Sequence, residues 1–296
     1  MKSLRNVSAS VRQRILNRSK ADRRSFSELL QYYAMERFLY RLSISDHAHH
    51  YILKGALMLR VWNASDFRST MDIDLLGKTG NEEENITAQI RNILAVEIEP
   101  DGLTFDSNSI QTERITEDAH YRGIRVRFRA VLGTSRISIQ IDIGFGDTVY
   151  PEPQLAVIPC MLNSPAPSLF CYTRESAIAE KFEAMIKLGQ LNSRMKDFYD
   201  IWLLSRRFEF VLGTLAEAVR LTFNQRGTEL SEPIDAFSNN FISYRQPMWV
   251  AFRKRLKQKH IPESFQEIVT GVELFLKPVI KGVSDNITWK PAGPWS

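Results

Sequence analysis

The sequence contains few of the features that identify secreted, membrane-spanning or disulfide-rich proteins. Among 296 residues there are only two cysteines, Cys160 and Cys171, too few for a disulfide scaffold or a zinc cluster. No stretch approaches the ~18 consecutive apolar residues of a membrane helix. The basic first 24 residues contain no apolar core of the kind found in signal peptides. We therefore expect a cytoplasmic protein that is not associated with a membrane.

Internal repeats and low-complexity tracts are also absent, and the composition is that of a globular protein, 44% hydrophobic and 25% charged. At ~100–200 residues per domain, this length accommodates one or two domains. The net charge of +5 and the pI near 9.2 are a mild bias toward polyanions such as nucleic acids or nucleotide phosphates. Lysine and arginine are concentrated in residues 2–24, 122–129 and 253–259.

The periodicity of apolar residues changes along the chain. The expected helices and strands of the first half are a helix over 26–43, an apolar helix opening at Gly55, a strand over 70–76, a helix over 81–96, and strands over 121–132 and 136–143. Residues 150–172 contain five of the twelve prolines, which predicts an extended linker or an irregular edge. The expected helices of the second half cover 174–189, 193–207, 212–225, 244–258 and 262–277. We therefore expect an α+β protein, with a mixed sheet and flanking helices in residues 1–165 and a helical bundle in 166–296.

Asp72 and Asp74 are the most informative pair in the sequence. Side chains two residues apart on a strand project from the same face, so these carboxylates can share one divalent cation such as Mg²⁺ or Mn²⁺. Asp142 lies on the polar face of another expected strand, which can bring a third carboxylate beside them. The alternative is that the pair is a solvated turn. Its place within an apolar alternation, where an unpaired charge is costly, favours the metal site.

Lys54 and Gly55 precede this pair at the start of an apolar segment. A glycine at the beginning of a helix lets backbone amides approach a phosphate, and the adjacent lysine adds positive charge. A lysine–glycine pair before a helix is also common for structural reasons, so this signal is weak by itself. Further donors suited to phosphate directly precede the aspartates: Arg68, Ser69 and Thr70.

Lys181 and the segment from Arg194 to Asp200 form a charged cluster on two consecutive expected helices. Asp197 lies three residues from both Arg194 and Asp200, so these side chains share a helix face. One interpretation is a set of surface ion pairs, which contribute little to stability. The apolar residues around them, such as Phe198, indicate instead a helix that is packed on two sides. A functional role is then expected for Lys181 and for Asp197 or Asp200.

Arg125, Arg127 and Arg129 alternate along the expected strand 121–132, whose other face is apolar; we call them the arginine stripe. We expect their guanidinium groups to point together into solvent, since no acidic residue interleaves them. The stripe is either a solvated sheet face or a contact for the phosphates of an acceptor RNA. The basic segment 253–259 is the alternative place for that contact.

Several motifs carry a resemblance to a known family in their order along the chain: ERFLYRLS (36–43), LKGALMLRVW (53–62), RSTMDIDLL (68–76), QIDIGFGD (140–147), EKFEAM (180–185) and SRMKDFYDIWLL (193–204). Together they resemble the AbiEii/AbiGii-type nucleotidyltransferase toxins, also called the MenT-like family, of the DNA polymerase β-like nucleotidyltransferase superfamily. The resemblance covers residues 26–205 and implies a nucleotidyltransferase-type mixed sheet.

The resemblance also implies roles for individual residues. Asp72 and Asp74 match the metal-binding pair of the family. Lys54 matches the lysine of the phosphate-binding turn, and Lys181 matches the lysine that reaches the triphosphate. One of Asp197 and Asp200 matches a late acidic residue, with the spacing slightly favouring Asp200, and Asp142 is a candidate base or second metal ligand.

The turn at Gly55 and the residue Thr70 can also be compared with the family pattern. Many members of the wider superfamily have Gly-Ser in the turn, where this chain has Gly55-Ala56, so one phosphate donor is missing. Thr70 matches a position where a serine or threonine is usual, and in related toxins such a residue can be the target of inactivating modification.

The activity that the resemblance implies is metal-dependent transfer of a nucleoside monophosphate from an NTP to an acceptor, with an RNA such as tRNA as the expected acceptor. The protein would be the toxin of a type IV-like toxin–antitoxin or phage abortive-infection system, in antiviral defence, with a cognate antitoxin as genetic or protein partner. The main alternative is a non-catalytic nucleic-acid-binding protein. A kinase-like phosphotransferase is a further alternative, but neither of its glycine-rich phosphate loops is present.

Overall fold

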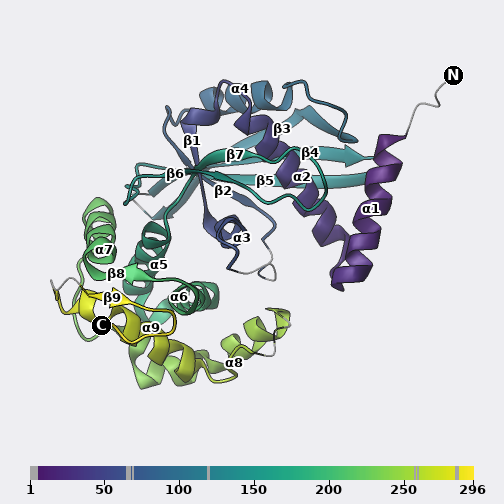
Figure 1. Ribbon diagram of the computed structural model, residues 1–296. Helices are drawn as coiled ribbons and strands as arrows, with labels where there is room; N and C mark the ends of the chain where they lie inside the picture. The colour runs from purple at the N-terminus through teal and green to yellow at the C-terminus, as the bar shows by residue number, and fades with distance from the viewer. Residues whose placement is uncertain are drawn as a thin grey trace. The chain divides into compact units, whose positions relative to one another are not determined.

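The chain divides into two compact units, each described here by itself. The computed structural model describes residues 6–64, 68, 70–118, 121–256, 258, 260–283 and 287–296. Unit 1 contains most residues up to Cys171, and unit 2 contains Tyr172 onward together with the segments 63–68 and 147–153. The expected α+β class is confirmed, because unit 1 is built on a seven-stranded mixed sheet and unit 2 is mainly helical (Figure 1).

Unit 1 combines four helices with the large sheet. The helices are α1 (Val7–Asp22), α2 (Phe26–Ser43), α3 (Met58–Val61) and α4 (Glu83–Leu94). The strands are β1 (Tyr51–Lys54), β2 (Ile73–Gly77), β3 (Leu103–Asp118), β4 (Tyr121–Leu132), β5 (Ser135–Phe145), β6 (Gln154–Val157) and β7 (Ser168–Cys171). Their order is β3-β4-β5-β2-β1-β7-β6, with β2–β5 and β1–β7 parallel and the other neighbours antiparallel.

The strict alternation of β4 and β5 gives the sheet one apolar and one polar face. The buried side chains of the apolar face are Ile124, Val126, Phe128, Ile137, Ile139, Ile141 and Ile143. Phe38 of α2 packs on this face, with its ring centroid 5.5 Å from that of Phe128. Burial of each such side chain stabilises the fold by about 1.5–3 kcal/mol. The intervening residues, including Asp142 and the arginine stripe, are thereby placed on the opposite face.

Helix α2 also buries three charged side chains that attach loops to it. Arg41 Nη1 lies 2.7 Å from Asp101 Oδ2, and Arg37 Nη2 donates to the carbonyl of Pro165 at 2.7 Å. Glu36 accepts the N–H of Met161 on both carboxylate oxygens at 3.0 Å. Burial raises the pKa of Glu36 to about 7, against the opposing effects of that N–H and of nearby arginines.

Replacement of Glu36 by glutamine is expected to change how stability depends on pH. A carboxyl whose folded pKa exceeds its unfolded value stabilises the fold at low pH, and this contribution is lost as pH rises through about 7. Relative to Glu36→Gln, the native chain should therefore lose roughly 2.5 kcal/mol of unfolding free energy between pH 5 and pH 8. Chemical denaturation of both proteins at the two pH values measures this difference. A constant difference would contradict the assigned pKa.

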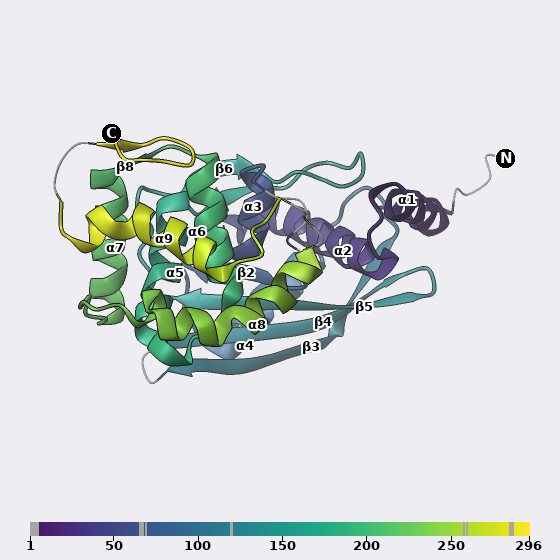
Figure 2. The same cartoon turned by 90° about the horizontal axis from the view of Figure 1, so that it is seen from below.

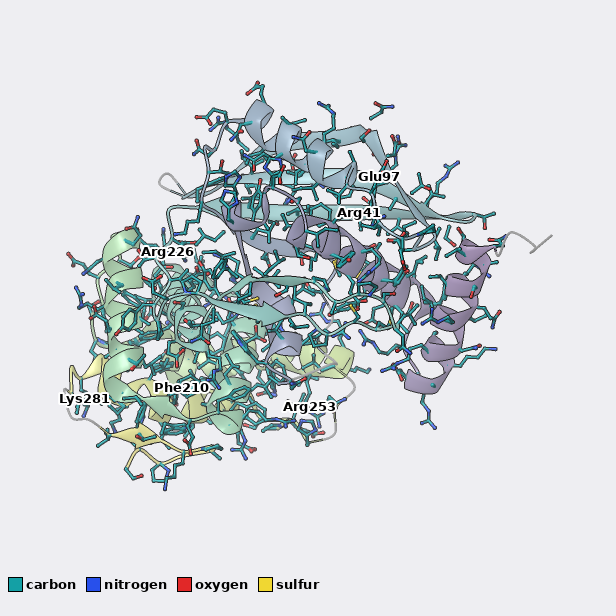
Figure 3. The ribbon with its side chains drawn as sticks, turned by 45° about the horizontal axis from the view of Figure 1, so that its top comes forward. Arg41, Glu97, Phe210, Arg226, Arg253 and Lys281 are labelled. Carbon is teal, nitrogen blue, oxygen red and sulfur yellow. The ribbon has the colours of Figure 1, made fainter. Side chains whose placement is uncertain are left out.

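Unit 2 consists of five helices and a two-stranded ribbon (Figure 2). The helices are α5 (Arg174–Leu188), α6 (Met195–Arg207), α7 (Leu212–Arg226), α8 (Asn239–Leu256) and α9 (Phe265–Ile280), and the ribbon pairs β8 (Phe210–Val211) with β9 (Thr288–Trp289). Arg226, labelled in Figure 3, ends α7 and lies 2.9 Å from both Asp147 and Glu183. None of the described helices is long and apolar enough to cross a membrane.

The structure differs from the sequence expectations in several places, and helix α1, strand β1 and the β8–β9 ribbon are among the elements that the periodicity does not predict. Of the two alternatives for the proline-rich segment 150–172, the edge agrees with the structure, because β6 and β7 within it extend the sheet at one side. Strand β3, the longest in the protein, was not expected, because its polar residues obscure any alternation. The segment after Gly55 is not one apolar helix but a single 3-10 turn, Gly55–Leu57, followed by the four-residue α3.

Candidate active site

Three carboxylates meet on the polar face of the sheet in unit 1. Asp74 on β2 and Asp142 on the parallel neighbour β5 are paired in register, and Asp72 directly precedes β2. Carboxylate oxygens of the three residues all lie within 4.8 Å of one another, and all three side chains are partly exposed. This donor set fits a hard divalent cation such as Mg²⁺, which prefers carboxylate oxygens and retains positions for water and phosphate.

Neighbouring residues hold two of these carboxylates in place. Thr70, itself 8% exposed, donates its hydroxyl to Asp72 Oδ1. Lys54 is the register partner of Asp74 on the other side of β2. Asp74 therefore lies within strand β2, whereas Asp72 lies in the bend that precedes this strand, where Thr70 binds its carboxylate.

Position 55 requires a glycine because its backbone lies against the side chain of Asp74. Its φ of +72° lies in the left-handed region, and a Cβ at this position would be 1.9 Å from Asp74 Oδ2 and 2.7 Å from Asp74 Cβ. The sequence suggested a different reason, a long helix whose first amides approach a phosphate. The helical segment that follows is too short for that reason to suffice, so the glycine is explained first by the room it leaves for Asp74.

The arginine stripe lies on one face of β4 with the side chains of Arg127 and Arg129 exposed, but all three guanidinium groups are paired with carboxylates, which the sequence does not predict. Each arginine contacts carboxylates, on β5 or on the unexpected strand β3. The shortest of these contacts are Arg125 Nε–Asp142 Oδ1 at 2.7 Å, Arg127 Nη1–Glu113 Oε1 at 2.8 Å and Arg129 Nη2–Asp106 Oδ2 at 3.2 Å. The carboxylates are distant in sequence, which explains why no acidic residue was seen near the stripe. The hydrogen bonds to Asp142 raise the pKa of Arg125 above its ordinary value.

A second charged cluster lies in unit 2. Lys181 Nζ on α5 is 3.0 Å from Asp197 Oδ1 and 2.8 Å from Asp200 Oδ2 on α6. Asp200 Oδ1 is 2.6 Å from Arg68 Nε, and Asp197 Oδ2 is 2.7 Å from Arg194 Nε. Both aspartates are 1% exposed, so the surface ion-pair interpretation is wrong. Because both bind Lys181, the contacts do not single out either one as the late acidic residue.

The protonation equilibria of the cluster favour its charged form. Burial alone would raise the pKa of Asp197 and lower that of Lys181, but their mutual attraction outweighs burial and shifts both in the opposite directions. A lowered acid pKa stabilises the fold above the unfolded value near 4, and a raised lysine pKa stabilises it below the unfolded value near 10.4. The cluster therefore stabilises unit 2 throughout the range between these values.

Replacement of Asp200 by asparagine is expected to destabilise unit 2 by about 3–5 kcal/mol, because it leaves Lys181 and Arg68 as incompletely compensated buried cations. The matched control is Glu217→Gln, which breaks an exposed ion pair with Arg220 on α7 and should leave stability unchanged. Thermal denaturation of the three proteins tests the prediction. Equal midpoints for Asp200→Asn and the native chain would show that the cluster adds nothing to stability.

Two further results concern the expected site residues. Ser69 lies outside the described residues. Arg125 is a partner of Asp142 that the sequence does not predict, whereas the pairing of Arg194 with Asp197 agrees with their spacing of three on one helix face.

The fold is that of nucleotidyltransferases. A candidate nucleotidyltransferase from Helicobacter pylori has a similar structure, with a TM-score of 0.52 over 88% of this chain and 97% of that one, at 14% identity. The protein JHP933 from Helicobacter pylori is similar at a TM-score of 0.51, covering 88% of this chain and 94% of that one, also at 14% identity. At such low identity these likenesses concern the fold alone.

The family is shown by sequence. Residues 37–271 match the family described as nucleotidyl transferase AbiEii toxin, type IV toxin–antitoxin (TA) system, and the chain belongs to this family. The expectation drawn from the six ordered motifs is thereby confirmed. No curated protein sequence matches the chain.

Proposed function

We propose that this protein is a metal-dependent nucleotidyltransferase toxin that transfers a nucleoside monophosphate from an NTP to an acceptor RNA such as tRNA. The convergence of Asp72, Asp74 and Asp142 is the observation that carries the proposal. Three carboxylates this close repel one another and also repel phosphate, so their arrangement is explained by a bound cation. A non-catalytic nucleic-acid-binding protein would have no use for it.

The proposed metal ligands are Asp72 and Asp74, with Asp142 as a third. A bound Mg²⁺ or Mn²⁺ would act as a Lewis acid on the phosphate oxygens of the NTP. We assign Asp142 as a ligand and not as the general base, because both its oxygens already accept hydrogen bonds from Arg125. A carboxylate paired in this way is a poor proton acceptor.

The nucleotide contacts that we propose follow from charge. Lys54 and the amides of the turn at Gly55 would bind phosphate, and Lys181 would neutralise the triphosphate. Arg68, Ser69 and Thr70 are the further proposed nucleotide contacts. Asp197 and Asp200 would then act through Lys181, since both hold its ammonium group within 3.0 Å.

The acceptor is proposed to be an RNA held partly by Arg127 and Arg129. These two guanidinium groups are the most exposed of the arginine stripe, with 41% and 65% of their side-chain surface accessible. Their carboxylate partners are themselves at least 39% exposed, so an RNA phosphate can compete for them. The family also implies an antitoxin as the biological partner, and growth arrest by expression of the toxin alone is the expected consequence.

The experiment uses the position of a radioactive label. The full-length protein is incubated with Mg²⁺, total RNA and each of the four NTPs, labelled on either the α- or the γ-phosphate. Nucleotidyl transfer places the α-label on RNA, and the γ-label leaves with pyrophosphate. Transfer of the γ-label would indicate a kinase instead. If the RNA carries neither label and the α-label is found on protein, the acceptor is a protein and the proposed RNA acceptor is wrong.

A further inference from the structure

Five charged side chains form one row across five neighbouring strands of unit 1. The register pairs are Lys54 with Asp74, Asp74 with Asp142, Asp142 with Arg125, and Arg125 with Glu113. Residues paired in register lie on the same face of a sheet. The row therefore places two carboxylates between two cations, and the third site carboxylate, Asp72, lies next to this row.

Arg125 forms a bidentate ion pair with Asp142. Its Nε donates to Asp142 Oδ1 at 2.7 Å, and its Nη2 donates to Asp142 Oδ2 at 2.8 Å. Each carboxylate oxygen has two lone pairs, and Arg125 uses one on each oxygen. Gln140 Nε2 also donates to Asp142 Oδ2, at 3.4 Å, so Oδ1 is the oxygen that keeps a second position for a metal ion. By contrast, Nη1 of the Arg125 guanidinium is 3.9 Å from Glu113 Oε1, a much weaker contact.

The charges of the site are consistent with a counter-ion role for this arginine. Asp72, Asp74 and Asp142 together carry three negative charges, and Arg125 offsets one of them at Asp142. Without Arg125 the three carboxylates would repel one another more strongly in the metal-free protein. A cation at the same carboxylates would in turn be repelled by the guanidinium and would compete with it for Asp142.

We propose that Arg125 is a counter-ion of the metal site, which occupies both oxygens of Asp142 in the metal-free protein and competes with the metal ion for that carboxylate. This inference rests on the proposed function, because it needs the cation to bind at the three aspartates. The competition by Arg125 for Asp142 makes metal binding weak in the free protein. It also favours binding of the metal together with the phosphates of the nucleotide. A purely structural ion pair would have the opposite effect, since its loss would loosen the site and weaken metal binding.

The test is a titration of the full-length protein with Mn²⁺ alone, followed by the electron paramagnetic resonance signal of free Mn²⁺. Arg125→Gln removes the positive charge and both hydrogen bonds, and it is expected to bind Mn²⁺ about tenfold more tightly than the native chain. Arg125→Lys keeps the charge without the bidentate geometry, and about threefold tighter binding is expected. This second variant also keeps the proposal testable if Arg125→Gln does not fold.

The matched control is Arg129→Gln, which removes the same charge from the same face of β4 but contacts Asp106 instead of Asp142. Its Mn²⁺ affinity should stay within twofold of the native value. If the control variant bound Mn²⁺ as much more tightly as Arg125→Gln does, the effect would come from net charge alone and the proposal would be overturned. Unchanged or weaker binding by folded Arg125 variants would also overturn it.

Two aspartate variants separate this inference from the function on which it rests. Asp72→Asn should abolish Mn²⁺ binding, and native-like binding in this variant would refute the proposed metal site itself, whatever the arginine variants show. In an Asp142→Asn background, Arg125→Gln should lose most of its tightening effect, because Asp142 is the ligand for which the arginine competes. Full tightening in that background would overturn the inference while leaving the metal site intact.

Discussion

Replacement of Asp74 by alanine should lower the rate of nucleotidyl transfer by at least about 10³-fold while the protein stays folded. The loss follows from the removal of one of three converging ligands, since metal ions supply several kcal/mol of transition-state stabilisation and each 1.4 kcal/mol is a factor of ten. Asp72→Ala should behave in the same way. The thermal midpoint should hold or rise, because mutual repulsion is relieved.

A matched control for these variants is Glu83→Ala, which removes a carboxylate from α4 of the same unit. Its partner is Arg114, and 33% and 53% of the two side-chain surfaces are accessible, so activity and stability should change little. Rates are measured with α-labelled NTP and the acceptor that shows transfer. Native rates in both Asp72→Ala and Asp74→Ala would refute the proposed mechanism.

Gly55→Ala should reduce transfer about 100-fold or more, although it adds only a methyl group. The new Cβ would lie 1.9 Å from Asp74 Oδ2, so the carboxylate must leave its position, and small displacements of catalytic groups cost about this factor. The left-handed φ of +72° adds about 1–2 kcal/mol of backbone strain. The variant should therefore be both less stable and nearly inactive.

Gly227→Ala separates these two effects. Gly227 has a φ of +63°, and nothing lies within 4 Å of a Cβ placed there. The control therefore has the same backbone strain without the collision with Asp74. It should show the loss of stability but retain its activity. If both glycine variants lost activity equally, strain and not the displacement of Asp74 would explain the effect.

The parts of the fold that could be predicted from sequence are those with strong local periodicity. Strands β4 and β5 alternate without interruption, and α2, α5 and α6 begin and end within two residues of the expected bounds. Local pattern suffices there because one face of each element is buried and the other is not. The short strands β6 and β7 were missed because prolines surround them and their apolar runs are only a few residues long.

From the sequence, only those parts of the site could be predicted that follow from the geometry of a single helix or strand. Asp72 and Asp74 are two residues apart, so their common face follows from strand geometry, and Asp142 was expected to join them from its place on a polar strand face. The partners of the arginine stripe could not be found in this way. Glu113 and Asp106 belong to β3, and their pairing with β4 depends on register between strands, which no local pattern specifies.

The central claim is that Asp72, Asp74 and Asp142 bind the metal ion used in nucleotidyl transfer. Crystals of the native protein grown with Mn²⁺ and a non-hydrolysable NTP analogue test it directly, because Mn²⁺ can be located by its anomalous scattering. The account predicts an anomalous peak about 2.1 Å from oxygens of at least two of these aspartates, with phosphate oxygens completing the coordination. A nucleotide bound with its metal elsewhere, and no peak at the three carboxylates, would contradict the account.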